Sequence, residues 1–352
     1  MTKAYLVTGG CGFIGSALVR ALASSGHRIC VVDCLSYAGH RANLQGISGI
    51  VDLETINICD RMAVTAVIDK VKPDAILHLA AETHVDRSID DASPFVQTNI
   101  VGTHALLEAA RNYWNHLAAK QKGAFRFIHV STDEVYGSID LGAVDEDAPY
   151  RPRSPYAASK AASNHLVRAW HTTYKFPTVT VLASNNYGPR QHPEKLIPTI
   201  IRRAISDQSI PIYGDGSNQR DWIYVDDNIS AIRAALKRGE TGTAYNVGTM
   251  ALSSNIEIAQ RVCASLDELR DQPLGTHAKN ISFVQDRPGH DWRYSVNAAR
   301  AQNQLGWAPT LSIDEGLKKT VKWYLDNTKW IETVMEGRYH GSRLGLSTMS
   351  KT

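Results

Sequence analysis

The 352-residue sequence lacks features that mark several classes of protein. No apolar run approaches the length of a membrane span, and the stretch Met1 to Leu6 contains no segment that resembles a signal peptide. The five cysteines are an odd number without the pairing typical of metal ligands. A zinc site at Cys30 and Cys34 is disfavoured because Cys30 falls inside an expected strand. We therefore expect a cytoplasmic protein with reduced thiols, no membrane association and no metal.

An excess of charge of one sign is also lacking. The 38 Lys and Arg residues nearly balance the 35 Asp and Glu residues, for a formal net charge of +3, and no Lys/Arg run resembles a nucleic-acid-binding patch. Hydrophobic residues make up 43% and charged residues 21%, which is ordinary for a globular protein. The length suffices for one large or two moderate domains. We therefore expect a globular protein with no nucleic-acid partner.

A glycine-rich motif lies between an apolar run and a helical segment near the N-terminus. The run Ala4 to Thr8 is typical of a buried strand, and residues 16–24 have helical character. Glycines here permit a tight turn and bring a pyrophosphate close to a helix N-terminus, so the motif predicts dinucleotide binding. The residues of the motif are Gly9, Gly12, Phe13, Ile14 and Gly15.

An acid follows the next strand at the spacing that such a motif requires. The expected strand Arg28 to Val32 ends in Asp33. An acid at this place suits the ribose hydroxyls of NAD and would repel the extra phosphate of NADP. The alternative is a structural turn with a solvated Asp33.

Strands and helices continue to alternate along the first half of the chain. Ala75 to Ala80 is typical of a buried strand, and the small Ala80 and Ala81 would let a cofactor lie against the backbone, although alanines are also common in cores. Asn99 opens a helix whose apolar face predicts packing on a sheet. Further strands are expected at 125–130 and 178–184. This alternation predicts an α/β fold with a Rossmann-type, doubly wound parallel sheet.

The alternation fades near residue 185. Segments rich in Gly, Pro and polar residues then separate amphipathic helices, such as 255–269 and 313–327. We expect residues 1–185 to form an NAD-binding domain and residues 186–352 to form a smaller mixed α/β domain that binds the substrate. Strand-like stretches at 222–225 and 244–247 are expected to return to the first domain.

Two acids, Asp133 and Glu134, follow the strand expected at 125–130. Ligands of open α/β sheets bind at the carboxyl ends of the strands, so these acids predict a proton-handling site rather than a charged surface loop. In a continuing strand the two side chains would face opposite sides of the sheet. We therefore expect the strand to end near Ser131 and both acids to lie on a turn or in the first turn of a helix.

A Tyr-x-x-x-Lys pattern opens the helix that runs to about Tyr174. Tyr156 and Lys160 share one helix face. An ammonium group and a positively charged nicotinamide near the phenol would favour the phenolate, and Thr132 can hydrogen-bond the same substrate oxygen. These residues predict oxidation of an alcohol by NAD. A half-buried tyrosine at a helix start is the alternative interpretation.

Oxidation alone does not require Asp133 and Glu134. Two carboxylates that share a site cannot both ionise freely, so one becomes an acid and the other stays a base. The base could remove a proton α to the new carbonyl while the acid protonates a departing β-hydroxyl. Together these two steps make a dehydration.

Motifs across most of residues 4–325 carry a resemblance to a known family. They are TGGCGFIG (8–15), HLAAETHVDRS (78–88), TNIVGT (98–103), STDEVYG (131–137), SPYAASKAASNHLVRAW (154–170), SNNYGPRQHPEKLIP (184–198), QRDWIYVDD (219–227) and DRPGHDWRY (286–294). The chain resembles the extended short-chain dehydrogenase/reductases and, more narrowly, the dTDP-glucose 4,6-dehydratases. Related epimerases, decarboxylases and GDP-sugar dehydratases are not expected to carry the Asp-Glu pair in this form.

The resemblance implies a dehydration of dTDP-glucose in three steps on one bound sugar. Tyr156 takes the O4 proton while hydride leaves C4 for NAD. Glu134 then removes the C5 proton as Asp133 protonates the C6 hydroxyl, and hydride finally returns to C6 to give a 4-keto-6-deoxy sugar nucleotide. A homodimer, formed through helices 99–114 and 154–174, is also implied.

The resemblance further implies contacts to the cofactor and the substrate. Cofactor contacts are expected at Asn57, Ile58 and Asn99 in addition to the residues above. Substrate contacts are expected at His84, Asn185, Glu194, Lys195, Leu196, Arg220, Arg287 and His290. Arginine suits the diphosphate because a guanidinium can bind phosphate through two hydrogen bonds.

Some positions depart from the family pattern. Asn57 stands where many relatives have Asp, although its carbonyl can still accept a hydrogen bond from the adenine amino group. Arg153 stands where a small serine is usual, and a substrate role for Tyr339 rests on a loose match. The alternatives to dTDP-glucose dehydration are the same reaction on UDP-glucose, a nucleotide-sugar 4-epimerase and a non-catalytic nucleotide-binding regulator.

Overall fold

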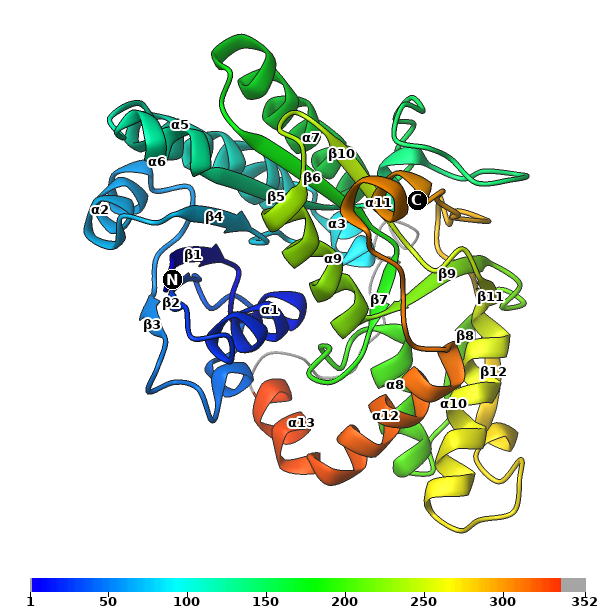
Figure 1. Cartoon of the computed structure of the whole chain (residues 1–352). Coiled ribbons are helices and arrows are strands. Elements are labelled where there is room, and N and C mark those ends of the chain that lie inside the picture. The colour runs from blue at the N-terminus through cyan, green and yellow to red at the C-terminus, as the bar shows by residue number, and fades with distance from the viewer. Residues whose placement is uncertain (1, 337–352) are drawn as a thin grey trace.

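The computed structural model describes residues 2–336, and a seven-stranded sheet lies at their centre (Figure 1). The strand order is β10-β6-β5-β4-β1-β2-β3, and every adjacent pair is parallel. The strands are β1 (Ala4–Thr8), β2 (Arg28–Val32), β3 (Asp52–Glu54), β4 (Ala75–His78), β5 (Arg126–Thr132), β6 (Thr178–Ala183) and β10 (Ala244–Val247). All carboxyl ends therefore meet at one edge, and the strand order reverses between β1 and β4. The predicted parallel, doubly wound sheet is confirmed.

Helices cover both faces of this sheet. Val7 belongs to the core on one face, whereas Leu6 belongs to the core on the other, because successive side chains of a strand alternate. The first face is covered by α1 (Phe13–Ala23), α9 (Val225–Arg238) and α11 (Ala299–Leu305), and the second by α2 (Arg61–Val71), α5 (Thr103–Asn115) and α7 (Pro155–Tyr174). Burial on both faces explains why these strands are continuous apolar runs in the sequence.

Short helical segments fill the connections around the sheet. The helix expected to open at Asn99 instead starts earlier, since α4, a π-helical segment η2 and α5 follow one another without a break. The short helical segments of the connections are η1 (Arg41–Leu44), α3 (Val85–Asp90), α4 (Ser93–Phe95), η2 (Val96–Gly102), α6 (Ala119–Ala124), η3 (Asp133–Tyr136) and η4 (Ala278–Asn280).

The second half of the chain builds a smaller α/β part with its own core. Its sheets have the orders β11-β9-β7 and β12-β8. Its strands are β7 (Asn185–Tyr187), β8 (Ile210–Tyr213), β9 (Gln219–Tyr224), β11 (Leu252–Ser254) and β12 (Ile281–Val284), and its helices are α8 (Leu196–Ile205), α10 (Asn255–Leu269), α12 (Ile313–Asp326) and α13 (Thr328–Met335). Ser254 and Ser312 begin α10 and α12 with reciprocal capping bonds to the glutamate three residues on.

Two stretches were expected to return to the first domain, and only one of them joins the large sheet. Residues 244–247 form β10, which extends the large sheet beside β6. Residues 222–225 do not join that sheet, because β9 pairs with β7 and β11. Strand β9 nevertheless lies between the two cores: Ile223 packs into the first core, and Trp222 and Tyr224 pack into the second.

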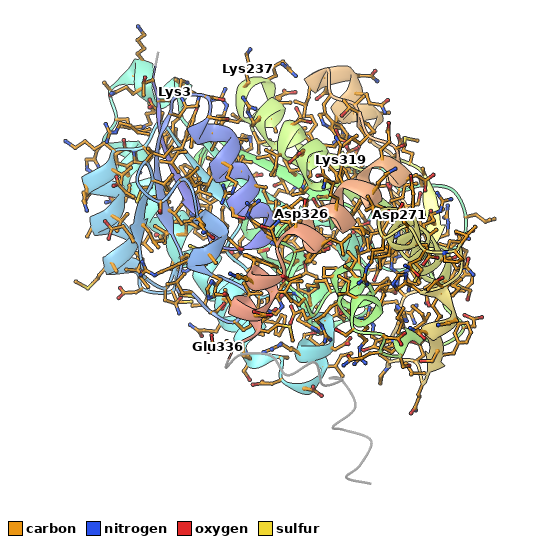
Figure 2. The ribbon with its side chains drawn as sticks, turned by 90° about the horizontal axis from the view of Figure 1, so that it is seen from below. Lys3, Lys237, Asp271, Lys319, Asp326 and Glu336 are labelled. Carbon is orange, nitrogen blue, oxygen red and sulfur yellow. The ribbon has the colours of Figure 1, made fainter. Side chains whose placement is uncertain are left out.

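Charged side chains lie on the outside of the molecule (Figure 2). The exposed residues labelled there are Lys3, Lys237, Asp271, Lys319, Asp326 and Glu336. No helix within residues 2–336 has both the length and the apolar character needed to cross a membrane. Tyr339 lies outside the described residues.

Candidate active site

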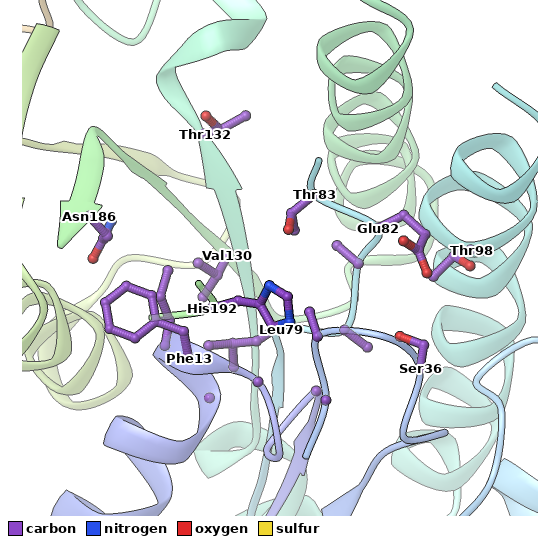
Figure 3. Close-up of a pocket in the computed structure, with 18 of the residues that line it drawn as sticks. Phe13, Ser36, Leu79, Glu82, Thr83, Thr98, Val130, Thr132, Asn186 and His192 are labelled. Carbon is purple, nitrogen blue, oxygen red and sulfur yellow. The ribbon is translucent and has the colours of Figure 1, made fainter. Parts of the chain in front are cut away.

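A cavity of about 290 Å³ lies along the carboxyl ends of β1, β2, β4 and β5, where the strand order reverses. Figure 3 shows Phe13, Glu82 and Thr132 around it, from the start of α1, the loop after β4 and the end of β5. The predicted cofactor residues that line it are Gly9, Gly12, Phe13, Ile14, Gly15, Asp33, Asn57, Ile58, Ala80, Ala81, Tyr156 and Lys160. Sequence motifs more than a hundred residues apart therefore meet at this one site.

The glycine-rich turn is packed too closely to accept side chains. Gly9 has a φ of +71°, and a Cβ on it would lie 2.6 Å from the backbone nitrogen of Ala80. A Cβ on Gly15 would lie 2.0 Å from the carbonyl oxygen of Gly9. Gly12 caps α1 without a side-chain hydrogen bond, so the first N–H groups of this helix remain available at the cavity. This cradle fits a pyrophosphate at a helix N-terminus.

Asp33 occupies the end of β2 at the edge of the same cavity. Its two carboxylate oxygens accept hydrogen bonds from the backbone N–H groups of Cys11, at 2.9 Å, and Leu35, at 2.8 Å. Burial raises the pKa of Asp33, and these two hydrogen bonds oppose that shift. The carboxylate is thus held rigidly against the glycine-rich turn, where it suits ribose hydroxyls.

Asn99 is predicted to contact the cofactor, but it is absent from the described lining of this cavity. Its amide oxygen accepts from the N–H of Glu82 at 2.9 Å, while its amide nitrogen donates to the carbonyl of Glu82 and to the hydroxyl of Ser159. The buried side chain therefore fastens the loop after β4 to α7. Asn57 does line the cavity, and its amide oxygen also accepts from the N–H of Cys59.

The strand that carries the two acids ends before them. Strand β5 stops at Thr132, one residue later than expected, and Asp133 and Glu134 begin η3. The hydroxyl of Thr132 caps this short helix by accepting from the N–H of Glu134 at 3.3 Å. The prediction that both acids lie in a turn or a first helical turn is confirmed.

The two carboxyl groups have different surroundings. Burial raises the pKa of Asp133 well above its usual range, and the nearby carboxylates of Glu134 and Asp221 add to the shift. Burial also raises the pKa of Glu134, but Arg287, Arg220 and Lys195 oppose that shift. One carboxylate oxygen of Asp133 has no hydrogen-bond partner among residues 2–336. Asp133 is thus suited to hold a proton that it can donate, and Glu134 to be ionised and accept one.

Tyr156 and Lys160 lie on the buried face of α7 and line the same cavity. The ammonium group of Lys160 donates to the carbonyl of Val130 at 2.9 Å, and burial lowers its pKa to about 7. Burial raises the pKa of Tyr156, the carboxylates of Glu134 and Asp133 add to the shift, and a hydrogen bond with Thr132 opposes it. In the protein alone Tyr156 therefore stays protonated, and the predicted shift towards the phenolate depends on the nicotinamide charge as well as on Lys160.

A second cavity, of about 490 Å³, opens beside the first and shares Glu134, Asn185 and Lys195 with it. All predicted substrate residues line it: His84, Asn185, Glu194, Lys195, Leu196, Arg220, Arg287 and His290. Glu134 thus stands where the two cavities meet. A sugar held at this junction would face Tyr156, Asp133 and Glu134 together.

Two of the arginines that line the second cavity, Arg220 and Arg287, are held by other parts of the chain. Arg220 donates to the carbonyl of Asp291 at 2.8 Å and to that of Trp292 at 3.1 Å. Arg287 forms a 2.7 Å ion pair with Asp86 on α3. Both guanidinium groups are therefore oriented before any ligand binds, which lowers the entropy cost of binding a diphosphate.

His84 and Glu194 belong to a buried polar cluster between the two cavities. The ring nitrogen Nε2 of His84 lies 3.6 Å from the carboxylate of Glu194. Burial lowers the pKa of His84 to about 2, with Lys195 and Arg87 adding to the shift, so the imidazole is neutral. Arg87, His192 and Lys195 also lie within 4 Å of the Glu194 carboxylate, and burial raises the pKa of Glu194 while Lys195 and Arg87 oppose that shift.

Sequence reasoning missed the residues of α3 that connect the two cavities. Asp86 binds Arg287 and also accepts from the hydroxyl of Tyr213 at 3.0 Å. Ser88 accepts from the N–H of Tyr156 at 3.2 Å and so fixes the start of α7. Both residues lie in the stretch HVDRS (84–88), and this motif was the feature of the sequence that could have pointed to them. Arg153, which had no account in the sequence, forms a 3.4 Å ion pair with Asp291.

Comparison with known proteins agrees with this geometry. The family model described as GDP-mannose 4,6 dehydratase matches residues 6–320. A dTDP-glucose 4,6-dehydratase of Neisseria meningitidis serogroup B is 50% identical over 97% of this chain and 98% of that protein. The dTDP-glucose 4,6-dehydratase 1 of Escherichia coli K12 is 46% identical over 95% and 96%.

Solved structures of similar fold point to the same family. DesIV, a dTDP-glucose 4,6-dehydratase of Streptomyces venezuelae solved with NAD bound, superposes with a TM-score of 0.86 at 40% identity, over 94% of this chain and 99% of that one. A UDP-glucose 4-epimerase of Thermus thermophilus in complex with NAD superposes with a TM-score of 0.81 at 29% identity, over 92% and 99%. The chain therefore belongs to the nucleotide-sugar 4,6-dehydratase family, the extended short-chain dehydrogenase/reductases that include the dTDP-glucose 4,6-dehydratases.

Proposed function

We propose that the protein dehydrates dTDP-glucose to dTDP-4-keto-6-deoxyglucose, with NAD as a cofactor that is regenerated in each turnover. The observation that carries this function is the position of Glu134 at the junction of the two cavities, with Asp133 and Tyr156 beside it. A dehydrogenase or a 4-epimerase does not require two acids at this place. A dehydratase needs both.

The first cavity fits NAD. The glycine cradle would hold the pyrophosphate and Asp33 would hold the adenosine ribose, while Asn57 and Ile58 would contact the adenine. When bound, NAD would accept a hydride from C4 of the sugar and return it to C6, while Glu134 returns a proton to C5. The oxidised nicotinamide would also place a positive charge near the phenol. We propose that the part built on the seven-stranded sheet, residues 1–185 with the returning strand β10, binds NAD. The remaining residues from 186 bind the nucleotide sugar.

Tyr156 acts as the base for the alcohol. Its hydroxyl is protonated in the protein alone, so it must lose its proton to solvent or a neighbour before it accepts the proton from O4. Lys160 lies one helical turn away, and its charged form favours the phenolate. Thr132 holds the same sugar oxygen by a hydrogen bond. These three residues make the ketone that acidifies the neighbouring C–H bond.

Asp133 and Glu134 then carry out the elimination. Glu134 is the group whose ionised form is favoured by three cations, so it removes the C5 proton. Asp133 is the group that burial and two carboxylates keep protonated, so it donates its proton to the C6 hydroxyl as water leaves. Their separate environments match the opposite proton transfers that the reaction needs.

The nucleotide diphosphate would occupy the second cavity. Arg220 and Arg287 supply the guanidinium groups for the phosphates, and His290, Lys195, Asn185 and the backbone at Leu196 complete the set. His84 and Glu194 would contact the sugar. This arrangement would place the hexose next to the acids.

Incubation of the purified protein with dTDP-glucose tests the function. A 4-keto product, detected by its alkaline absorbance and by NMR, is expected without any added reductant. Absence of product with a panel of nucleotide sugars would refute the enzymatic assignment. UDP-glucose is the strongest competing substrate, because a thymine methyl group contributes only about 1–3 kcal/mol to discrimination. Competition between the two sugars in one reaction measures that preference directly.

We further propose a cytoplasmic homodimer. Exposed apolar side chains support the dimer: Val96 and Val101 lie on η2 and Tyr174 ends α7. Val101 and Tyr174 lie within segments 99–114 and 154–174, which the family resemblance assigns to subunit contact, and Val96 lies just before the first of them. The cysteines are free thiols, as expected in a reducing compartment. Light scattering on the eluting protein should give twice the chain mass, and a single-chain mass would refute the dimer.

A further inference from the structure

The segment from Asp286 to Tyr294 carries two proposed phosphate contacts and is fastened to catalytic segments at three places. Arg287 binds Asp86 on α3. The N–H groups of Trp292 and Arg293 both donate to the hydroxyl of Ser138, just after η3. The third fastening is the ion pair between Asp291 and Arg153, which lies immediately before the cap of α7.

Asp291 is a buried carboxylate with few partners. It is 3% exposed, and one of its oxygens accepts from the hydroxyl of Tyr294. The other oxygen has no hydrogen bond within the described chain and lies 3.4 Å from Arg153 Nη1. A buried charge requires such a counter-ion, since an unpaired one is costly.

The backbone around Asp291 transmits its position to the second cavity. The carbonyl oxygen of Asp291 accepts from Arg220 Nη2 at 2.8 Å and from the amide of Asn218 at 3.2 Å. Gly289, with a φ of +66°, approaches the backbone of Arg153 so closely that a Cβ would lie 3.3 Å from its carbonyl oxygen. A shift of Asp291 would therefore move Arg220 as well as the segment itself.

We propose that Arg153 is a positioning residue for the dehydration. Through Asp291 it sets Arg220 and the 286–294 segment in place for the nucleotide diphosphate, and it neutralises a carboxylate beside the catalytic acids. This inference rests on the proposed function. It assigns a role to a residue that touches neither the sugar nor the cofactor cavity.

The electrostatic part of the role concerns Glu134. The cations that face it are Arg287, Arg220 and Lys195, the carboxylates that face it are Asp291 and Asp133, and the neutral hydroxyls of Tyr156 and Tyr294 lie nearby. Asp291 raises the pKa of Glu134. Loss of the Arg153 charge leaves Asp291 uncompensated, so Glu134 should hold its proton up to a higher pH.

The test compares Arg153→Ser with Arg153→Lys and with Arg151→Ser, an exposed arginine of the same loop that serves as the matched control. Because Arg153 is half exposed, we expect Arg153→Ser to weaken dTDP binding and raise KM only about two- to fivefold, with kcat changed less. The acidic limb of the kcat/KM profile should move to higher pH. Arg153→Lys should restore both properties, and Arg151→Ser should change neither. High salt should bring the wild-type KM towards that of Arg153→Ser.

Two results would overturn the proposal. One is an Arg153→Ser variant whose dTDP affinity and pH profile match those of Arg151→Ser. The other is an Arg153→Ser variant with a lower Tm but an unmoved acidic limb, which would show a purely structural role. Asp291→Asn provides a second check, because adding Arg153→Ser to it should have no further effect on dTDP affinity. Calorimetric binding of dTDP does not depend on turnover, so failure of the dehydratase function would be recognised separately.

Discussion

Replacing Glu134 with glutamine should separate the oxidation of the sugar from the elimination of water. The substitution keeps the shape of the side chain and removes the base proposed for the C5 proton. Thr132, Tyr156 and Lys160 stay in place. The Glu134 carboxylate raises the pKa of both Tyr156 and Asp133, so its removal should ease deprotonation of the phenol and leave a smaller fraction of Asp133 protonated.

The expected magnitude follows from the loss of one general base. Such a loss typically slows the proton transfer about 10²- to 10⁴-fold, or about 3–5 kcal/mol in activation free energy. Oxidation should slow far less. In a single turnover with dTDP-glucose, the near-ultraviolet absorbance of NADH should therefore rise and persist. In deuterated water, NMR should show that deuterium no longer enters C5.

The reasoning fails if Glu134→Gln forms the 4-keto-6-deoxy product at more than about a tenth of the wild-type rate, since that is less than the smallest loss expected for a general base. Another base would then be at work, and the 4-epimerase alternative would gain support if a C4 epimer appeared. Asp140→Asn is the control, because this exposed carboxylate of the following loop should leave both steps unchanged.

Three further predictions concern the cradle, the acid pair and the phosphates. Gly15→Ala places a Cβ 2.0 Å from the Gly9 carbonyl oxygen. Calorimetry should therefore show a Tm lower by about 2–10 °C and weaker NAD binding. An unchanged Tm would contradict the close contact between Gly15 and Gly9. The plot of kcat/KM against pH should be bell-shaped. Activity should fall below the raised pKa of Glu134, where the base gains a proton, and above the more strongly raised pKa of Asp133, where the acid loses one. A profile that stays flat towards high pH would argue against Asp133 as the acid. Arg287→Met should weaken dTDP binding about 10- to 100-fold in calorimetry, and a loss under threefold would remove Arg287 from the phosphate site.

The parallel sheet could be predicted because its strands bury both faces. Apolar runs ended by glycine or acid gave β1, β2 and β10 with the bounds that the structure has. The pairing of β9 could not be predicted in the same way. Its alternating residues serve two cores at once, and nothing in its own pattern tells which strand lies beside it.

The site could be predicted where a residue's role depends on its neighbours along the chain. The end of the strand before Asp133 and Glu134 could be predicted because two adjacent strand residues cannot face the same side of a sheet. Asn99 was placed at the cofactor by its motif, but the direction of its side chain depends on Glu82 and Ser159, which only the folded chain brings near. The pair of Asp86 and Arg287 joins residues 201 positions apart, so no local pattern could reveal it.

The large sheet is covered late in the synthesis of the chain. One of its faces is covered partly by α9 and α11, and its edge strand β10 lies between them in the sequence, so six strands leave the ribosome before these elements exist. At usual elongation rates α9 follows β6 by roughly 3–11 s. For that time Ile128, Val130 and Val179 would lack the cover that α9 and α11 give them in the folded chain. A fragment that stops at residue 185 should for the same reason aggregate rather than fold.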